Sequence, residues 1–217
     1  MGVAGATGAG KTSLLNSLLE YPELLPSSST EAATATVCRI AWNDDDTPGH
    51  EFRAEVKFRT KEAVVKELVD VLCAVKSRKL LREEEFDDED DRIKAIEEVT
   101  DLISRGISKV CAIWGLDDGD IEDMDYTVEK VMADNSDVVE LLGTSETIYS
   151  PDADDFAIEV KPYLDSTPTR EDITAWPLID EVRIYVKSDI LKHGIVLVDL
   201  PGLSDMVRTL SALTSLV

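Results

Sequence analysis

Eight consecutive residues near the start of the chain have the types and spacing of a phosphate-binding loop. They fill the pattern G-x-x-x-x-G-K-[ST] with Gly5, Ala6, Thr7, Gly8, Ala9, Gly10, Lys11 and Thr12. Glycines let the backbone turn tightly, so that successive N–H groups can point at phosphate oxygens where a helix begins. Lys11 would reach the β- and γ-phosphates, and the Thr12 hydroxyl would be a ligand of Mg²⁺. The pattern predicts a nucleotide site, and its alternative is a chance match in a glycine-rich turn.

A second candidate metal ligand follows an apolar run near the other end of the chain. The residues Ile195-Val196-Leu197-Val198 lead directly into Asp199-Leu200-Pro201-Gly202. A buried strand that ends in a D-x-x-G turn has the layout of the second metal-side motif of P-loop hydrolases. Asp199 would hold Mg²⁺ through a water, and the N–H of Gly202 would sense the γ-phosphate. Without the first loop, the same stretch would be better explained as a strand that ends in a Pro-Gly turn.

The polar segment 26–36 is a candidate switch loop, because it lies just downstream of the predicted phosphate site and is rich in serine and threonine. In P-loop hydrolases with a switch mechanism, such a loop carries a threonine that reaches Mg²⁺ and the γ-phosphate. Thr34 is the first candidate, with Thr36 and Thr30 behind it. An ordinary Ser/Thr loop fits the composition equally well.

These motifs need strands and helices to position them. The spacing predicts a helix over Lys11–Glu20, a strand over Val37–Trp42 and an alternating strand over 52–58, with the last two joined as a hairpin through a turn at 43–49. Asp44, Asp45 and Asp46 are interpreted as the solvated tip of that turn rather than as a metal site. Another strand is expected at Val182–Val186, and the strand before Gly5 looks cut short.

Between the two motifs the pattern becomes helical. Helices are predicted from Lys61 onward, from Ile93 to about Trp114, and near 121–133, 136–142 and 153–164. The acidic run 83–91 interrupts them and is expected to be an exposed linker. Residues 61–175 are therefore predicted to be a mostly helical insertion in an α/β fold, and they contain no recognisable catalytic constellation.

The charge of the chain argues against nucleic acid and anionic membranes as partners. There are 45 acidic and 22 basic residues, for a formal net charge of -23, which repels nucleic acid and anionic membranes. No nucleic-acid partner is predicted, and neither a membrane segment nor a signal peptide is visible, so an intracellular location, cytoplasmic or nuclear, is expected. Cys38, Cys73 and Cys111 are expected to be buried free thiols.

Taken together, the Gly5–Thr12 loop, the stretch 33–37 (Ala-Thr-Ala-Thr-Val) and the stretch 198–205 (Val-Asp-Leu-Pro-Gly-Leu-Ser-Asp) resemble the large GTPases of the dynamin superfamily. The overall order is most similar to that of fungal relatives of the nuclear GTPase SLIP-GC. The resemblance implies that Gly5–Ser13 is the phosphate loop, Thr34 the switch I threonine and Asp199–Gly202 the entry to switch II.

The resemblance also implies an activity. It implies GTP and Mg²⁺ as cofactors, hydrolysis of GTP with Lys11, Thr34 and Gly202 as catalytic residues, and a possible homodimer through the GTPase domain. Residues 1–60 would be the N-terminal part of a P-loop GTPase domain, 61–175 an acidic helical insertion, and 176–217 a switch II hairpin with the start of the next helix.

Three features depart from the family pattern. Gly8 stands where dynamins proper carry serine, and no Asn/Thr-Lys-x-Asp motif is present to recognise guanine. The chain also appears truncated after switch II. Two alternatives therefore stay open: an ATP-binding P-loop protein, which lacks support because Asp199 is followed by Leu-Pro-Gly and not by a catalytic glutamate, and a nucleotide-binding or interaction protein without turnover.

Overall fold

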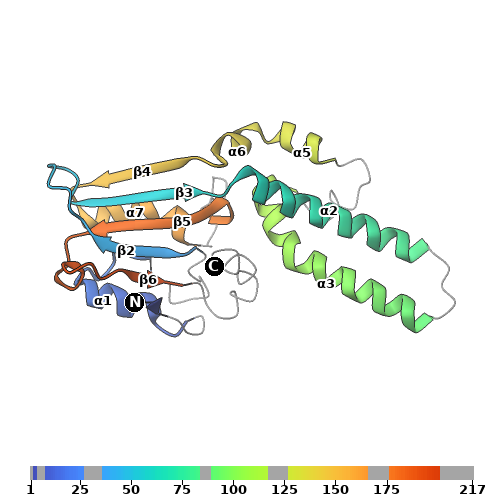
Figure 1. The fold of residues 1–217 in the computed structure, drawn as a ribbon, viewed down its shortest axis with the longest axis horizontal. Coiled ribbons are helices and arrows are strands. Elements are labelled where there is room, and N and C mark those ends of the chain that lie inside the picture. The colour runs from blue at the N-terminus through green and yellow to red at the C-terminus, as the bar shows by residue number, and fades with distance from the viewer. Residues whose placement is uncertain are drawn as a thin grey trace. The chain divides into compact units, whose positions relative to one another are not determined.

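The computed structural model describes residues 2–3, 8–26, 36–83, 89–116, 127–165 and 176–200. The chain divides into two compact units (Figure 1). The first comprises Met1–Phe58 and Thr144–Val217, and the second comprises Arg59–Gly143. Both candidate motifs of the sequence fall in the first unit.

The described residues of the first unit form a six-stranded mixed sheet with the order β1-β6-β2-β5-β3-β4 (Figure 1). The strands are β1 Gly2–Val3, β2 Cys38–Trp42, β3 Phe52–Phe58, β4 Ser145–Ser150, β5 Ile179–Val186 and β6 Leu197–Asp199. Strand β6 pairs parallel with β1 and antiparallel with β2. Strand β5 pairs parallel with β2 and antiparallel with β3, and β4 is antiparallel to β3.

Two helices cover this sheet with apolar faces. Helix α1, Lys11–Leu19, buries Leu15 and Leu19, and helix α7, Ala153–Leu164, buries Phe156, Val160 and Leu164. The start of α7 is capped by Asp152, whose side chain accepts hydrogen bonds from two backbone N–H groups of the first turn. Short 3-10 helices lie at Trp176–Leu178 (η1) and Asp189–Leu191 (η2).

The predicted hairpin between residues 37–42 and 52–58 is wrong. Strand β5 lies between β2 and β3, and in the same way β2 separates β5 from β6, so the expected switch II hairpin is absent from the described residues. The backbone N–H and C=O groups of β5, a strand whose side chains at Val182 and Ile184 are buried, need hydrogen-bond partners along both edges, and β2 and β3 supply them. The loop 43–51 is long enough to span the strand between.

That loop is built by its own polar residues rather than being only a solvated tip. Buried Asn43 donates to the carbonyls of His50 and Glu51 at 2.7 and 3.1 Å. Asp45 accepts from the backbone N–H of Thr47 at 2.9 Å and contacts Nδ1 of His50 at 2.8 Å. Hydrogen bonds from the Thr47 side chain, from His50 and from the Thr47 backbone N–H lower the pKa of the Asp45 carboxyl below its usual range. Asp44 and Asp46 are exposed, as predicted.

The second unit is helical over its described residues. It contains α2 Lys61–Glu83, α3 Glu89–Trp114, α5 Val128–Asp134 and α6 Ser136–Leu141. Helices α2 and α3 pack together through buried side chains that include Val71, Val75, Val110 and Trp114. The approach is close at Gly106, where a Cβ would lie 2.6 Å from Cγ2 of Val71. The predicted linker 83–91 is too long, because α2 extends to Glu83 and α3 begins at Glu89. Residues 84–88 of that linker, and residues 117–126, of which the sequence assigned 121–126 to the start of a helix, lie outside the described residues.

The helical unit ends earlier than the sequence indicated. The predicted insertion ran to residue 175, but residues 144–165 group with the sheet, because β4 pairs with β3 and α7 packs against β3, β4 and β5. The helical period identifies α7 as a helix, but it does not reveal which surface buries its apolar face.

Two features concern possible membrane spans and the cysteines. Among the described residues, none of the helices is long and apolar enough to cross a membrane. All three cysteines are free, but only Cys38 is buried, whereas Cys111 is half-buried and Cys73 is exposed. Cys73 differs from the prediction because it lies on the exposed side of α2. The buried side of this helix carries Val71, Leu72 and Val75.

Candidate phosphate and metal site

The described part of the glycine-rich loop leads directly into α1. Gly8 and Gly10 have φ angles of 77° and 79°, in the left-handed region that favours glycine, and a Cβ at either position would meet no atom within 4 Å. Glycine is therefore required here by backbone conformation and not by crowding. The first helical hydrogen bond runs from the N–H of Leu14 to the Gly10 carbonyl at 2.9 Å. The open N-terminus of α1 thus follows the loop, which is the arrangement that attracts an anion.

The side chain of Thr12 meets that of Asp199. The Thr12 hydroxyl donates a hydrogen bond of 3.0 Å to Oδ2 of Asp199. Asp199 is 2% exposed and is the last residue of β6. Its backbone lies opposite Val3 of β1 on one side and Cys38 of β2 on the other. The aspartate is therefore held between the strand that precedes the glycine loop and the strand that follows the Ser/Thr segment.

The other predicted site residues are partly outside the described region. Ala9, which precedes Gly10, and Ser13, in the first turn of α1, are exposed. Lys11 is half-buried. Gly5, Ala6, Thr7, Thr30, Thr34 and Gly202 lie outside the described residues. Thr36, an alternative to Thr34, is 3% exposed, and its hydroxyl has no hydrogen-bond partner in the described part of the chain.

The Thr12–Asp199 pair has the chemistry that Mg²⁺ prefers. A hydroxyl and a buried carboxylate are hard oxygen donors, and this ion usually takes one or two protein ligands and completes its shell with water and phosphate oxygens. No cluster of three or more His, Cys, Asp or Glu side chains that could hold a metal exists within the described ranges. The pair supplies two hard oxygen ligands, which fits an ion that takes the rest of its shell from water and phosphate oxygens.

Cys38 is a neighbour of the site that the sequence did not connect to it. Burial raises the pKa of the Cys38 thiol well above its usual value, and the negative charges of Asp199 and Glu181 act in the same direction. The thiol is therefore kept protonated and unreactive. Only the strand register, which sets Cys38 opposite Asp199, reveals this proximity.

Asn16 is a second residue that the sequence did not single out. Its side chain is 1% exposed, donates to the Leu25 carbonyl and accepts from the Leu25 N–H, each at 2.9 Å. The amide thereby ties the chain just before residues 27–35 to α1, one turn after Thr12. Its one sequence signal is a polar residue between Leu15 and Leu19 on the inward face of the helix.

Comparison with known sequences finds a match to a protein family. The model of the dynamin family matches residues 1–215. The nuclear GTPase SLIP-GC of Homo sapiens is 26% identical over 210 residues, which are 93% of this chain and 24% of that protein. Its counterpart in Mus musculus is 25% identical over 213 residues, which are 94% of this chain and 24% of that protein. The chain spans about a quarter of the length of these curated relatives.

Two solved structures of an oligomerised bacterial dynamin pair, described as sensing and tethering membranes over a long range, are similar at 19% sequence identity. They cover 98% and 99% of this chain, which corresponds to 21% and 24% of those chains, with TM-scores of 0.42 and 0.43.

Proposed function

This chain is an α/β P-loop domain of the GTPase type that belongs to the dynamin family, and we propose that it binds a guanine nucleotide together with Mg²⁺ and, as part of its whole protein, hydrolyses GTP. The observation that carries the proposal is the 3.0 Å hydrogen bond between Thr12 and Asp199. It joins the residue that ends the phosphate-loop pattern to the residue that begins the D-x-x-G turn, which are the two metal-side positions of such a site.

Each residue has a proposed role. The backbone of Gly5–Ser13 binds the phosphates at the start of α1, and Lys11 contacts the β- and γ-phosphates. Thr12 and Asp199 hold Mg²⁺, and this ion, when bound, neutralises charge on the phosphates. Thr34 completes the metal and γ-phosphate contacts from switch I, and the N–H of Gly202 orients the γ-phosphate from switch II.

Catalysis in this proposal comes from position and charge. A water attacks the γ-phosphorus in line with the leaving oxygen, and Lys11 stabilises the negative charge of the transferring group. The choice of guanine over adenine is supported by the two curated relatives, each of which is called a nuclear GTPase. Their name also supports a nuclear location for this protein.

Self-association through the GTPase domain is proposed as the source of stimulation. If pairing of two domains completes the site, the specific activity should rise with protein concentration and then level off. If each domain acts alone, the specific activity stays constant across the series.

The direct test of turnover is release of phosphate from GTP by the purified whole protein, with ATP as the competing substrate and Lys11→Ala as the control. We expect GTP turnover that Lys11→Ala reduces by about a hundredfold or more, because the lysine contributes to the transition state. A wild-type whole protein that is folded by circular dichroism and releases no more phosphate than the variant would contradict the hydrolytic part of the proposal.

A further inference from the structure

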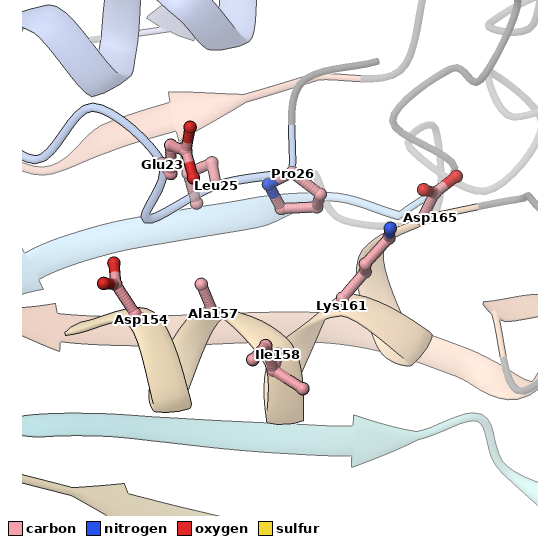
Figure 2. Close-up of a pocket in the computed structure, with 8 residues that line it drawn as sticks. All are labelled: Glu23, Leu25, Pro26, Asp154, Ala157, Ile158, Lys161 and Asp165. Atoms are coloured by element: carbon pink, nitrogen blue, oxygen red, sulfur yellow. The ribbon is translucent and has the colours of Figure 1, made fainter. Parts of the chain in front are cut away.

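The first unit contains a groove whose lining includes none of the described residues of the phosphate loop. Its volume is about 520 Å³, and it is lined by Glu23, Leu25 and Pro26 on one side and by α7 and Asp165 on the other. Figure 2 shows Asp154, Ala157, Ile158 and Lys161 along α7, opposite Glu23, Leu25 and Pro26. These α7 positions recur at helical spacing, so they form one face of the helix.

Both walls of the groove are fixed from behind. The opposite face of α7 is held on the sheet by Phe156 and Val160, each 0% exposed. The other wall is held by the two hydrogen bonds between the Asn16 amide and the Leu25 backbone. A groove with anchored walls is preorganised, so a partner can bind without the cost of ordering it.

The lining combines an apolar floor with an acidic rim. Ile158 is 70% exposed, which makes it the most exposed of the large apolar side chains in the described ranges. Glu23, Asp154 and Asp165 line the groove with carboxylates, whereas Lys161 is its one basic lining residue. An apolar side chain flanked by basic ones would complement this surface.

The chain itself carries a matching segment near the end of α2. Lys76, Lys79 and Leu80 are all exposed, and their spacing of three and four residues sets them on one face of the helix. Leu80 is 62% exposed, second only to Ile158 among the described large apolar side chains. The net charge of -23 makes a general attraction between copies unfavourable, whereas a local basic surface such as this one is complementary to the acidic rim of the groove.

We infer that the groove binds the Lys76–Leu80 face of α2 from a second copy of this chain. Leu80 packs on Ile158 and Ala157, and the two lysines lie against Glu23 and Asp154. Because the groove and the α2 face are different surfaces, the contact is heterologous and propagates from copy to copy rather than closing at a pair. The inference does not use the nucleotide site.

The test is sedimentation velocity of the chain without nucleotide across a concentration series. We expect species larger than a dimer that grow with concentration. Ile158→Asp and Leu80→Asp should each weaken association by about tenfold or more, because each places a charge in the apolar contact. Both side chains are exposed, so thermal unfolding should match the wild type.

Charge exchange makes the test specific. Asp154→Lys and Lys79→Glu should each weaken association, and the double variant should restore it because the pair of charges is exchanged. Glu159→Lys on α7 and Lys66→Glu on α2 carry the same charge changes at exposed positions outside the contact and should leave association unchanged. A wild-type chain that stays monomeric at all concentrations, or association that persists in both aspartate variants, would overturn the inference. Because the experiment contains no nucleotide, a negative result for self-association is distinct from a failure of the chain to bind GTP.

Discussion

The Thr12 hydroxyl lies 3.0 Å from Oδ2 of Asp199 and donates a hydrogen bond to it, although 187 positions separate the two residues in the chain. The sheet makes this possible, because β6 lies between β1 and β2 and brings Asp199 beside the start of α1. Residues near the two ends of the chain therefore each contribute one side chain to this pair.

Replacing Thr12 tests that pairing. Thr12→Val keeps the shape of the side chain but removes the hydroxyl, so the buried Asp199 carboxylate loses a donor and the proposed metal loses a ligand. We expect the free energy of unfolding to fall by ~1–3 kcal/mol and the gain in nucleotide affinity on adding Mg²⁺ to be lost. Thr12→Ser keeps the hydroxyl and should retain both. Urea unfolding and nucleotide titrations with and without Mg²⁺ measure the two effects, and equal behaviour of the two variants would contradict the account.

The Asn16 amide is expected to be a large stabilising contact. Asn16→Leu fills the same space but leaves the N–H and C=O of buried Leu25 without partners, at ~1–3 kcal/mol each. We therefore expect a loss of ~2–6 kcal/mol in the free energy of unfolding. Ser17→Ala, one residue along on the exposed side of α1, should change it by less than ~0.5 kcal/mol. A stable Asn16→Leu variant would show that the Leu25 backbone finds other partners.

Gly106 tests the packing of α2 on α3. Alanine is better than glycine by ~1 kcal/mol in a helix interior, so helix propensity alone predicts that Gly106→Ala stabilises the protein. The added Cβ would lie 2.6 Å from Cγ2 of Val71, however, and we expect a net loss of ~1–3 kcal/mol. In a Val71→Ala background the clash is removed, and the same change should become neutral or stabilising. Double-mutant unfolding measures this coupling, and simple additivity would refute the close approach.

Tyr163 gives the fold a dependence on alkaline pH. Burial, together with the 2.9 Å hydrogen bond to Glu146 and the negative charge of that residue, raises the pKa of Tyr163 to about 12. The protonated phenol is favoured in the folded state, so its contribution is complete below a pH of about 10 and is lost between about 10 and about 12. The phenolate absorbance of Tyr163 is obtained by subtracting the spectrum of Tyr163→Phe from that of the wild type. This difference should titrate with a midpoint near pH 12. Glu146→Gln should move that midpoint downward, and an unchanged midpoint would exclude a role for the Glu146 charge.

Local patterns predict the helices of this chain well. Helix α7 begins and ends where its apolar spacing indicates, and α1 differs by one residue at its end. Strand β4 was missed because Ile148 is its one buried apolar residue, so its sequence shows almost no alternation. The strand pairings failed for another reason: a turn between two strands indicates a hairpin, whereas the insertion of β5 between β2 and β3 depends on residues far along the chain.

In the candidate site, too, some residues could be predicted from the sequence and others could not. The glycine pattern and the D-x-x-G turn identified Thr12 and Asp199 as candidates, because spacing alone carries that information. The roles of Asn16 and Cys38 could not be predicted. Asn16 hydrogen-bonds to the backbone of Leu25, and the position of Cys38 beside Asp199 depends on the register of β2 and β6.

The most direct test of the central claim is equilibrium binding of fluorescent GTP and ATP analogues with Mg²⁺, comparing the wild-type chain with Lys11→Ala. We predict that GTP binds, that excess unlabelled ATP does not displace it, and that Lys11→Ala weakens binding by about tenfold or more because the phosphate contact is lost. Equal binding of GTP and ATP would contradict the guanine assignment, and a folded wild-type chain that binds neither nucleotide would contradict the phosphate site itself.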